Sequence, residues 1–296
     1  MSVFRDLGLL SLPVSDFQRI TVLGSGLLGG SVALAVAKRR PESSVILWGR
    51  NEERVTAIRS GGFPDVTSDL KRAVANADLV ILAVPVGAMV DLGRDALDAG
   101  LRAGVCVTDV GSVKGHPHAT VGELMAEQGH AFIGSHPMAG SEQTGFAAAN
   151  PDLFEDAPCI LTNEQERSEI ELRSLRSFWE SLGARTALMT APDHDRLVAR
   201  ISHVPHVLSA VCALVALKNP GDGDYAGQGL RDTSRVGGGD PAMWTEILME
   251  NREQIEAPLR ECGNILTELA DYLRQGGADE ILGVLMKGQI RRRLLD

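Results

Sequence analysis

The loop "GSHPMAGSE" (134–142) is a candidate reactive site, because it holds a histidine among residues that otherwise only shape a turn. His136 follows the apolar run "AFIG" and is surrounded by Gly, Pro, Ser and Ala. An imidazole has an unperturbed pKa of about 6.5, so in its neutral form it accepts or shares a proton near pH 7. We expect His136 to work as a general base if a substrate hydroxyl is held against it.

Three further segments carry side chains that could bind or polarise a substrate. They are "DVGSVK" (109–114) with Ser112 after a strand, "SHVPH" (202–206) with Ser202, His203 and His206 within one or two helical turns, and "GLRDTSR" (229–235) with Arg231 and Arg235.

Each of these candidate residues has a plainer interpretation. Serine commonly caps the segment after a strand. The histidines could be core residues, and the arginines could be loop charges paired with Asp232 or Asp240. Trp244 could be a core anchor and Glu142 a surface carboxylate. We expect no metal site, because no third ligand lies at a suitable spacing from the two histidines.

A glycine motif predicts a dinucleotide site. "GSGLLG" (24–29) follows the predicted strand "RITVLG" and opens a predicted helix, which is the context that gives this motif its meaning. The first glycine permits a tight turn, the second lets the backbone approach a pyrophosphate, and the third allows close packing of helix on strand. The helix amino terminus then favours the anion. The residues expected at this site are Gly24, Gly26, Leu27, Leu28 and Gly29.

The end of the second predicted strand bears on the choice between NADP and NAD. An NAD site usually has an Asp or Glu there, for the ribose 2′-hydroxyl. The sequence "WGRNEE" instead places Gly49 and Arg50 at that point, and an arginine suits a 2′-phosphate. We therefore favour NADP, although Glu52 or Glu53 could serve NAD if the strand ends later. The pair Val84 and Pro85, after the fourth strand, lies where the cofactor would cross the sheet edge.

The order of predicted elements indicates an α/β protein with two parts. Short β-rich runs alternate with amphipathic segments up to about residue 190, as in βαβ units, and long helical patterns follow from Ala191. We predict an amino-terminal extension (1–18), a Rossmann-type doubly wound parallel sheet (19–190) and an all-helical second domain (191–296). The run 130–136 is predicted to be one strand. The Gly- and Asp-rich stretch 219–241 is predicted to be a loop rather than a helix.

Composition excludes several classes of protein. With 29 basic and 39 acidic residues the net charge is -10, which argues against binding to nucleic acid or to an anionic membrane. Four scattered cysteines are typical of buried thiols in a reducing compartment. The amino terminus is a poor signal peptide, and the apolar window 198–217 contains Arg200 and two histidines, which favours a buried helix over a bilayer span. We expect a cytoplasmic protein.

Taken in order, the motifs resemble those of the prephenate/arogenate dehydrogenase family of tyrosine biosynthesis. They are the glycine loop, "TDVGSVK", "GSHPMAGSE", "DHDRLVARISHVPH" and "GLRDTSRVGGGDPAMW". The resemblance covers the chain from about Arg19 to the region of Glu250, and "HPMAG" and "SHxPH" are more specific than the glycine motif. We expect no chorismate-mutase domain before it and no regulatory domain after it.

This resemblance implies NAD(P)-dependent oxidative decarboxylation of prephenate, arogenate or both. A hydride would leave the carbon that bears the ring hydroxyl, the ring carboxylate would depart as CO2, and the ring would become aromatic. His136 would accept or share the hydroxyl proton, and Ser112 would contact the same hydroxyl and the nicotinamide end. The remaining implied roles are the carboxylate anchor Arg235, the entrance residue Arg231, the side-chain contacts Ser202 and His206, the access residues Asp195 and Trp244, and the ammonium contact Glu142.

The resemblance also implies a homodimer through the helical domain. Two other functions stay open at this stage. One is a dehydrogenase of the β-hydroxyacid or imine-reducing type, which would share the glycine loop and the helical domain but has no need of "HPMAG" together with "SHxPH". The other is a non-catalytic NADP-sensing protein, which would bind the cofactor without turnover.

Overall fold

A six-stranded parallel sheet forms the centre of the amino-terminal part in the computed structural model, which describes residues 16–140 and 143–295. Its strand order is β3-β2-β1-β4-β5-β6. The bounds are β1 (Arg19–Leu23), β2 (Ser44–Trp48), β3 (Val66–Thr67), β4 (Leu79–Leu82), β5 (Cys106–Asp109) and β6 (Ala131–Phe132). The strand order reverses between β1 and β4, and ligands of such sheets bind at the carboxyl ends of the strands near that point. The predicted Rossmann-type fold is confirmed.

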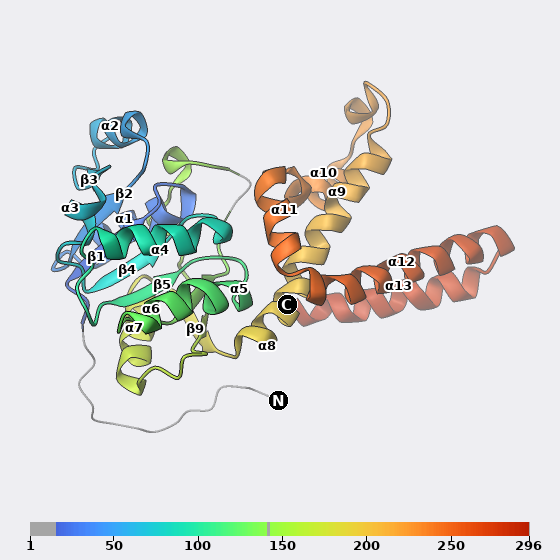
Figure 1. Ribbon diagram of the computed structural model, residues 1–296. Coiled ribbons are helices and arrows are strands. Elements are labelled where there is room, and N and C mark those ends of the chain that lie inside the picture. The colour runs from blue at the N-terminus through green and yellow to red at the C-terminus, as the bar shows by residue number, and fades with distance from the viewer. Residues whose placement is uncertain (1–15, 141–142, 296) are drawn as a thin grey trace.

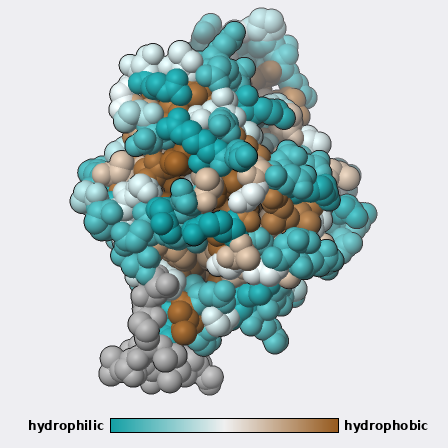
Figure 2. Space-filling model, turned by 60° about the vertical axis from the view of Figure 1, so that its left-hand side comes forward, coloured by the Kyte–Doolittle hydropathy of each residue, from teal (hydrophilic) through white to brown (hydrophobic). Residues whose placement is uncertain are grey.

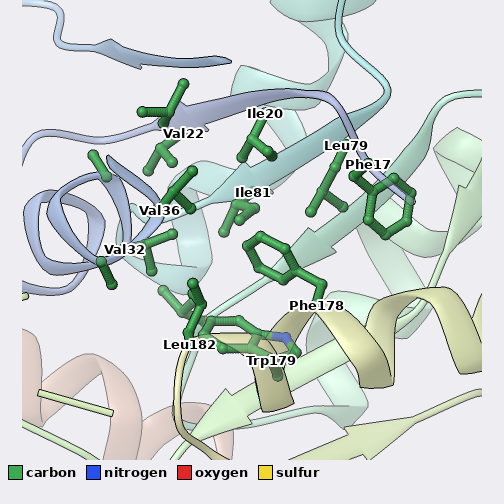
Figure 3. Packing of buried hydrophobic residues seen from close by; sticks show 14 of the residues in the cluster. Phe17, Ile20, Val22, Val32, Val36, Leu79, Ile81, Phe178, Trp179 and Leu182 are labelled. Carbon is green, nitrogen blue, oxygen red and sulfur yellow. The ribbon is translucent and has the colours of Figure 1, made fainter. Parts of the chain in front are cut away.

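Helices cover both faces of this sheet because its strands are apolar on both sides. One face packs on α1 (Leu27–Arg39) and α7 (Glu169–Ser181), and Figure 3 shows Phe178 of α7 near Ile81 and Leu79 of β4, with Trp179 beside Leu182. The opposite face packs on α3 (Leu70–Val74), α4 (Met89–Asp98) and α6 (Glu123–Glu127). Strand residues alternate between the two cores, as a period of two requires. The short helix α2 (Glu52–Ser60) follows β2.

The predicted strand 130–136 was wrong in one respect, because the structure divides it between two sheets. β6 ends at Phe132, and β7 (Gly134–Pro137) pairs instead with β8 (Pro158–Thr162), which pairs with β9 (Arg185–Leu188). The break depends on a side chain of the neighbouring strand β5. The Asp109 carboxylate at the end of β5 accepts a hydrogen bond from the Ser135 amide at 3.2 Å, in place of a main-chain carbonyl. The chain that carries His136 therefore leaves the first sheet at its carboxyl edge.

All described elements after β9 are helical. Apart from three short 3₁₀ turns, they are α8 (Ala191–Val198), the π-helical turn η4 (Ala199–His203), α9 (Val204–Ala216), α10 (Gln228–Ser234), α11 (Pro241–Glu250), α12 (Arg252–Gln275) and α13 (Ala278–Arg292). Figure 1 shows α11 on the side nearest the sheet, while α9 with α10 and the hairpin of α12 and α13 extend away from it. Pro205 has no amide hydrogen to donate one turn back, and the wider π-helical turn ends two residues before it, at His203.

The prediction of a loop over 219–241 was also wrong in part. This stretch holds α10 and two 3₁₀ turns, η5 (Asp222–Tyr225) and η6 (Arg235–Gly238). Two side-chain hydrogen bonds within α10 stabilise the helix. Gln228 donates to Asp232 at 2.7 Å, and the Ser234 hydroxyl donates to the Leu230 carbonyl at 2.7 Å. Glycines lie both between these short elements and within them, as Gly229 does in α10, so composition alone concealed the helix.

Polar residues dominate the face shown in Figure 2, and apolar surface is confined there to separate patches. Within the described residues, the helix Ala191–Ala216 is long and apolar enough to cross a membrane by length and composition, and 33% of its most apolar window is buried in the protein.

Candidate active site

The glycine loop between β1 and α1 has the shape that a pyrophosphate needs. Gly24 has φ of 129°, and a Cβ there would lie 2.1 Å from the Ala83 carbonyl oxygen, so only glycine fits. A Cβ on Gly29 would lie 1.9 Å from the Gly24 carbonyl oxygen. A Cβ on Gly26 would meet nothing within 4 Å, and Gly26 caps α1 without any side-chain hydrogen bond. The first amides of α1 are therefore available to an anion, and the loop fits a dinucleotide.

The end of β2 presents a cation beside this loop. Gly49 is buried against Ser25, and the next residue, Arg50, is exposed. Asn51 is already engaged, because its side chain accepts the Arg54 amide at 2.8 Å to cap α2. The Glu52 carboxylate accepts the Ser68 hydroxyl. At the other side of the loop, Val84 borders Gly24, and Pro85 follows at the surface.

His136 lies on β7, opposite Ile160 of β8, and its side chain is buried. Its Nδ1 is 2.8 Å from Nε2 of His194, which lies on α8. The two rings meet edge to face, with centroids 5.0 Å apart. A residue from the second sheet and a residue from the first helix of the carboxy-terminal part are therefore joined by a buried hydrogen bond.

Asp195 continues this line of polar groups. Nδ1 of His194 is 2.8 Å from Asp195 Oδ1, and the two carboxylate oxygens also accept the amides of Lys114 and Gly115, each at 2.8 Å. The carboxylate is thus held behind the imidazoles by groups of the turn after β5. Asp195 also lines a cavity with His116 and Glu250, and the access role that the resemblance implied for it stays a prediction.

A buried ion pair fixes the base of the site. The Lys114 ammonium and the Asp109 carboxylate form an ion pair in which both side chains are fully buried. Asp109 also accepts the amides of Gly111, at 2.9 Å, and Ser135. Such a pair is costly to break, since a lone charge would be left in the interior. It ties the turn after β5 to the strand that carries His136.

Burial and nearby charge keep His136 neutral. Burial lowers the pKa of His136 well below its usual value, and the neighbouring His194, Lys114 and His203 lower it further. Burial likewise lowers the pKa of His194, against the opposing effect of Asp195. A neutral imidazole has one nitrogen that accepts a proton, which is the state a general base requires at pH 7.

His203 and Asn251 join the helices around this centre. The Asn251 side-chain nitrogen lies 2.8 Å from the Asp195 carbonyl oxygen and 3.1 Å from His203 Nδ1. Burial lowers the pKa of His203 to about 4. Since Asn251 lies between α11 and α12, it connects these helices to the segment that holds His194 and Asp195.

His206 and Trp244 form the other wall of the group. Their rings are stacked, with centroids 3.5 Å apart and planes 10° from parallel. A Cβ on Gly239 would lie 2.5 Å from the Trp244 indole nitrogen and 3.3 Å from the His206 ring, so the backbone of this turn lies close to both. The Ser209 hydroxyl donates to the Thr233 carbonyl at 2.7 Å and accepts the Gly237 amide at 2.9 Å, which binds the turn to α9.

The structure therefore brings some expected residues together and leaves others apart. His136, Asp195, His206 and Trp244 belong to one network of contacts with His194 and His203. Ser112 is half-buried in the turn after β5, and Ser202 is half-buried in η4. Arg231 on α10 and Arg235 on η6 are exposed at the margin. Glu142 and residues 1–15 of the expected extension lie outside the described residues.

Four residues of this centre received no role from the sequence: Asp109, Lys114, His194 and Asn251. His194 directly precedes Asp195 in a segment that was already singled out, so a signal for it existed. The contacts of Asp109 and Lys114 depend on how β7 leaves the first sheet, and Asn251 gives no local signal.

The fold and the site define a dinucleotide-dependent dehydrogenase with a helical second part. Residues 32–188 match the family described as prephenate dehydrogenase, nucleotide-binding domain, and residues 190–287 match prephenate dehydrogenase, dimerization domain. The chain belongs to the prephenate dehydrogenase family.

Named proteins agree with this assignment, and a solved structure shares the fold. The chain is 33% identical to a prephenate dehydrogenase of Lactococcus lactis over 241 residues, which are 80% of this chain and 66% of that protein. It is 34% identical to a cyclohexadienyl dehydrogenase of Zymomonas mobilis over 243 residues, which are 79% of this chain and 81% of that protein. The structure of prephenate dehydrogenase from A. aeolicus in complex with hydroxyphenyl propionate and NAD+ shares the fold, with a TM-score of 0.84 at 24% identity over 94% of this chain and 98% of that chain.

Proposed function

We propose that the protein oxidises and decarboxylates prephenate, arogenate or both, with NADP as the favoured hydride acceptor. One observation carries the proposal: His136 is buried, uncharged and fixed at the carboxyl edge of a dinucleotide-binding sheet. Family membership and the names of its relatives support this substrate class over the β-hydroxyacid, imine-reducing and non-catalytic alternatives.

The reaction divides between the cofactor and this chain. The bound nicotinamide supplies the hydride acceptor. His136 holds the proton of the ring hydroxyl while the carbon–oxygen bond becomes carbonyl-like. The bond between the ring and its carboxylate then breaks, its electron pair completes the aromatic ring, and the oxygen regains the proton. The reaction releases no net proton, so His136 only has to accept the hydroxyl proton and then give it back.

Anionic substrate groups need local cations in a protein of net charge -10. Arg235 is the proposed anchor for a substrate carboxylate, since a guanidinium can bind it with two parallel hydrogen bonds. The turn that carries Arg235 is bound to α9 through Ser209 and adjoins His206 and Trp244. Ser112 is proposed to contact the ring hydroxyl of the substrate, and Ser202 its side chain. Arg231 is proposed to lie at the entrance of the site.

NADP is favoured by the end of β2. Arg50 is exposed there, whereas Asn51 caps a helix and Glu52 is engaged by Ser68. A ribose 2′-hydroxyl therefore meets no unengaged carboxylate at the positions 50–52, and a 2′-phosphate would meet a guanidinium.

We also propose a homodimer formed by the helical part, in the cytoplasm. Large apolar side chains are exposed along α9 and the α12–α13 hairpin, among them Leu214, Val215, Leu266, Leu273, Leu282, Leu285 and Ile290. An apolar surface of this kind is typical of a protein interface, and the matching family description names this part a dimerization domain.

The proposal of a cytoplasmic protein draws on the four cysteines, which are unpaired thiols and therefore support a reducing compartment. The acidic net charge supports a small molecule rather than nucleic acid or a membrane as the ligand.

A turnover assay separates the candidate functions. The protein is incubated with prephenate or arogenate and with NADP or NAD, and both reduced nicotinamide and CO2 are measured. The proposal predicts equal amounts of the two products. Reduced nicotinamide without CO2 would indicate another dehydrogenase, and cofactor binding without turnover would indicate a sensing protein.

A further inference from the structure

We infer that His194 and Asp195 are positioning residues that hold His136 in one tautomer, with its Nδ1 protonated and its Nε2 presented to the substrate as the proton acceptor. The inference deepens the proposed function and rests on it for its catalytic consequence. The tautomer itself can be measured without any substrate.

The direction of the hydrogen bonds is set at the Asp195 end. The carboxylate oxygens accept the amides of Lys114 and Gly115, which can only donate. Burial alone would raise the pKa of Asp195, but the hydrogen bonds from His194 and from these two amides outweigh burial and lower it. An ionised carboxylate has no hydrogen to donate. The His194 Nδ1 at 2.8 Å must therefore carry the proton of that hydrogen bond.

The proton on His194 Nδ1 in turn sets which atom donates in the hydrogen bond between His194 and His136. A neutral His194 that is protonated at Nδ1 has a lone pair at Nε2. Nε2 lies 2.8 Å from His136 Nδ1, which must therefore be the donor. Neutral His136 is left with its lone pair on Nε2, the nitrogen that faces away from His194. The order of donors and acceptors thus fixes which nitrogen can take the substrate proton.

Protonation of His194 would reverse the outcome. Its Nε2 would then donate to His136 Nδ1, so a neutral His136 would carry its proton on Nε2 and could not accept another there. Burial and the Lys114 ammonium oppose this reversal, and their effect outweighs that of the two nearby carboxylates. Lys114 faces both rings, His203 faces His136, and burial lowers the pKa of His194, while Asp195 and Asp109 act in the opposite sense on His194.

The protein supplies a matched control. His116 lines the same cavity of about 370 Å³ as Asp195, yet its Nδ1 pairs with Glu250 at 2.7 Å and it has no hydrogen bond to His194 or His136 among the described residues. Replacing His116 removes an imidazole near the site and leaves the hydrogen-bonded residues His136, His194 and Asp195 unchanged.

The test uses protein labelled with 15N in its histidines, and His136→Asn assigns the His136 signals. In the wild type we expect Nδ1 of His136 to be the protonated nitrogen and Nε2 the unprotonated one near pH 7. His194→Leu should leave a mixture of tautomers and lower kcat roughly 10- to 100-fold, with the cofactor Kd unchanged. His194→Gln, whose amide oxygen can still accept from Nδ1, should recover most of that loss, and His116→Asn should change neither tautomer nor kcat.

A wild-type His136 protonated at Nε2 would overturn the inference, and so would His194→Leu with unchanged tautomer and turnover. The wild-type spectrum decides the tautomer even if His194→Leu fails to fold. Should the wild type hold the expected tautomer but turn over neither prephenate nor arogenate, the proposed function fails while the positioning by His194 and Asp195 stands.

Discussion

The imidazole of His206 lies flat on the indole of Trp244, with ring centroids 3.5 Å apart and planes 10° from parallel. The two residues come from α9 and α11, so the stack joins two helices at the wall of the site. Burial lowers the pKa of His206 against the opposing effect of its hydrogen bond to the Val236 backbone, so the ring is neutral at pH 7 and has one nitrogen, Nδ1, left for a substrate. The stack fixes the plane in which that nitrogen points.

Trp244→Ala should therefore raise KM about 2- to 10-fold with little change in kcat, because a stacked aromatic pair contributes about 0.5–1.5 kcal/mol. Trp244→Phe keeps a ring beneath the imidazole and should stay within about twofold of the wild type. Steady-state kinetics with both variants measure this. An alanine variant with wild-type KM would show that the stack does not orient His206 for the substrate.

Arg235→Gln should mainly raise KM, by roughly 10- to 100-fold, because a charge-assisted hydrogen bond to a substrate carboxylate contributes about 1.5–3 kcal/mol in both the bound and the transition state. The measurement is the dependence of initial rate on prephenate or arogenate. Arg231→Gln is the matched variant, since both arginines are exposed on neighbouring short helices. If only Arg231→Gln raised KM, the carboxylate anchor would be Arg231 and not Arg235.

Arg50→Asp should shift the cofactor preference towards NAD. The change removes the cation proposed for the 2′-phosphate and adds a carboxylate that can accept from a ribose 2′-hydroxyl. We expect the ratio of kcat/KM for NADP over that for NAD to fall by about 10-fold or more, since a charged hydrogen bond contributes about 1.5–3 kcal/mol. An unaltered ratio would contradict the interpretation of the end of β2.

His203 should make the protein less stable in acid. Burial lowers its pKa to about 4, while the unfolded chain has a pKa near 6.5, so below pH 6.5 the unfolded state binds more protons. Its contribution to the free energy of unfolding is complete above pH 6.5 and falls by on the order of 3 kcal/mol as the pH drops to about 4. Denaturant unfolding at several pH values measures this. His203→Gln, which keeps an acceptor for Asn251, should flatten the decline, and an equal slope in both proteins would contradict it.

Sequence patterns predicted the sheet well because its information is local. Apolar runs with both faces buried, and a glycine loop between strand and helix, depend on residues close together in the chain, and β1, β2, β4 and β5 lie where those runs predicted them. The break between β6 and β7 depends on the Asp109 carboxylate, 26 residues before Ser135 in the chain. The helix α10 is hidden by Gly227, which precedes it, and by Gly229 within it.

The site followed the same division. His136, His206 and Trp244 stood out through residue type and through the family resemblance, and the structure places them in one group. His194 received no role, because its importance comes from a hydrogen bond across 58 residues of sequence. The π-helical turn before Pro205, which changes the direction of the side chains around Ser202 and His203, has no signature that a periodicity of 3.6 residues reveals.

The most direct test of the account is the kcat of His136→Asn with prephenate or arogenate, measured together with the Kd for the cofactor. The account predicts a fall in kcat of roughly 10²–10⁴ with nearly unchanged cofactor affinity, because the variant keeps the glycine loop but loses the proton acceptor. Turnover at the wild-type rate would contradict it and would remove His136 from the mechanism.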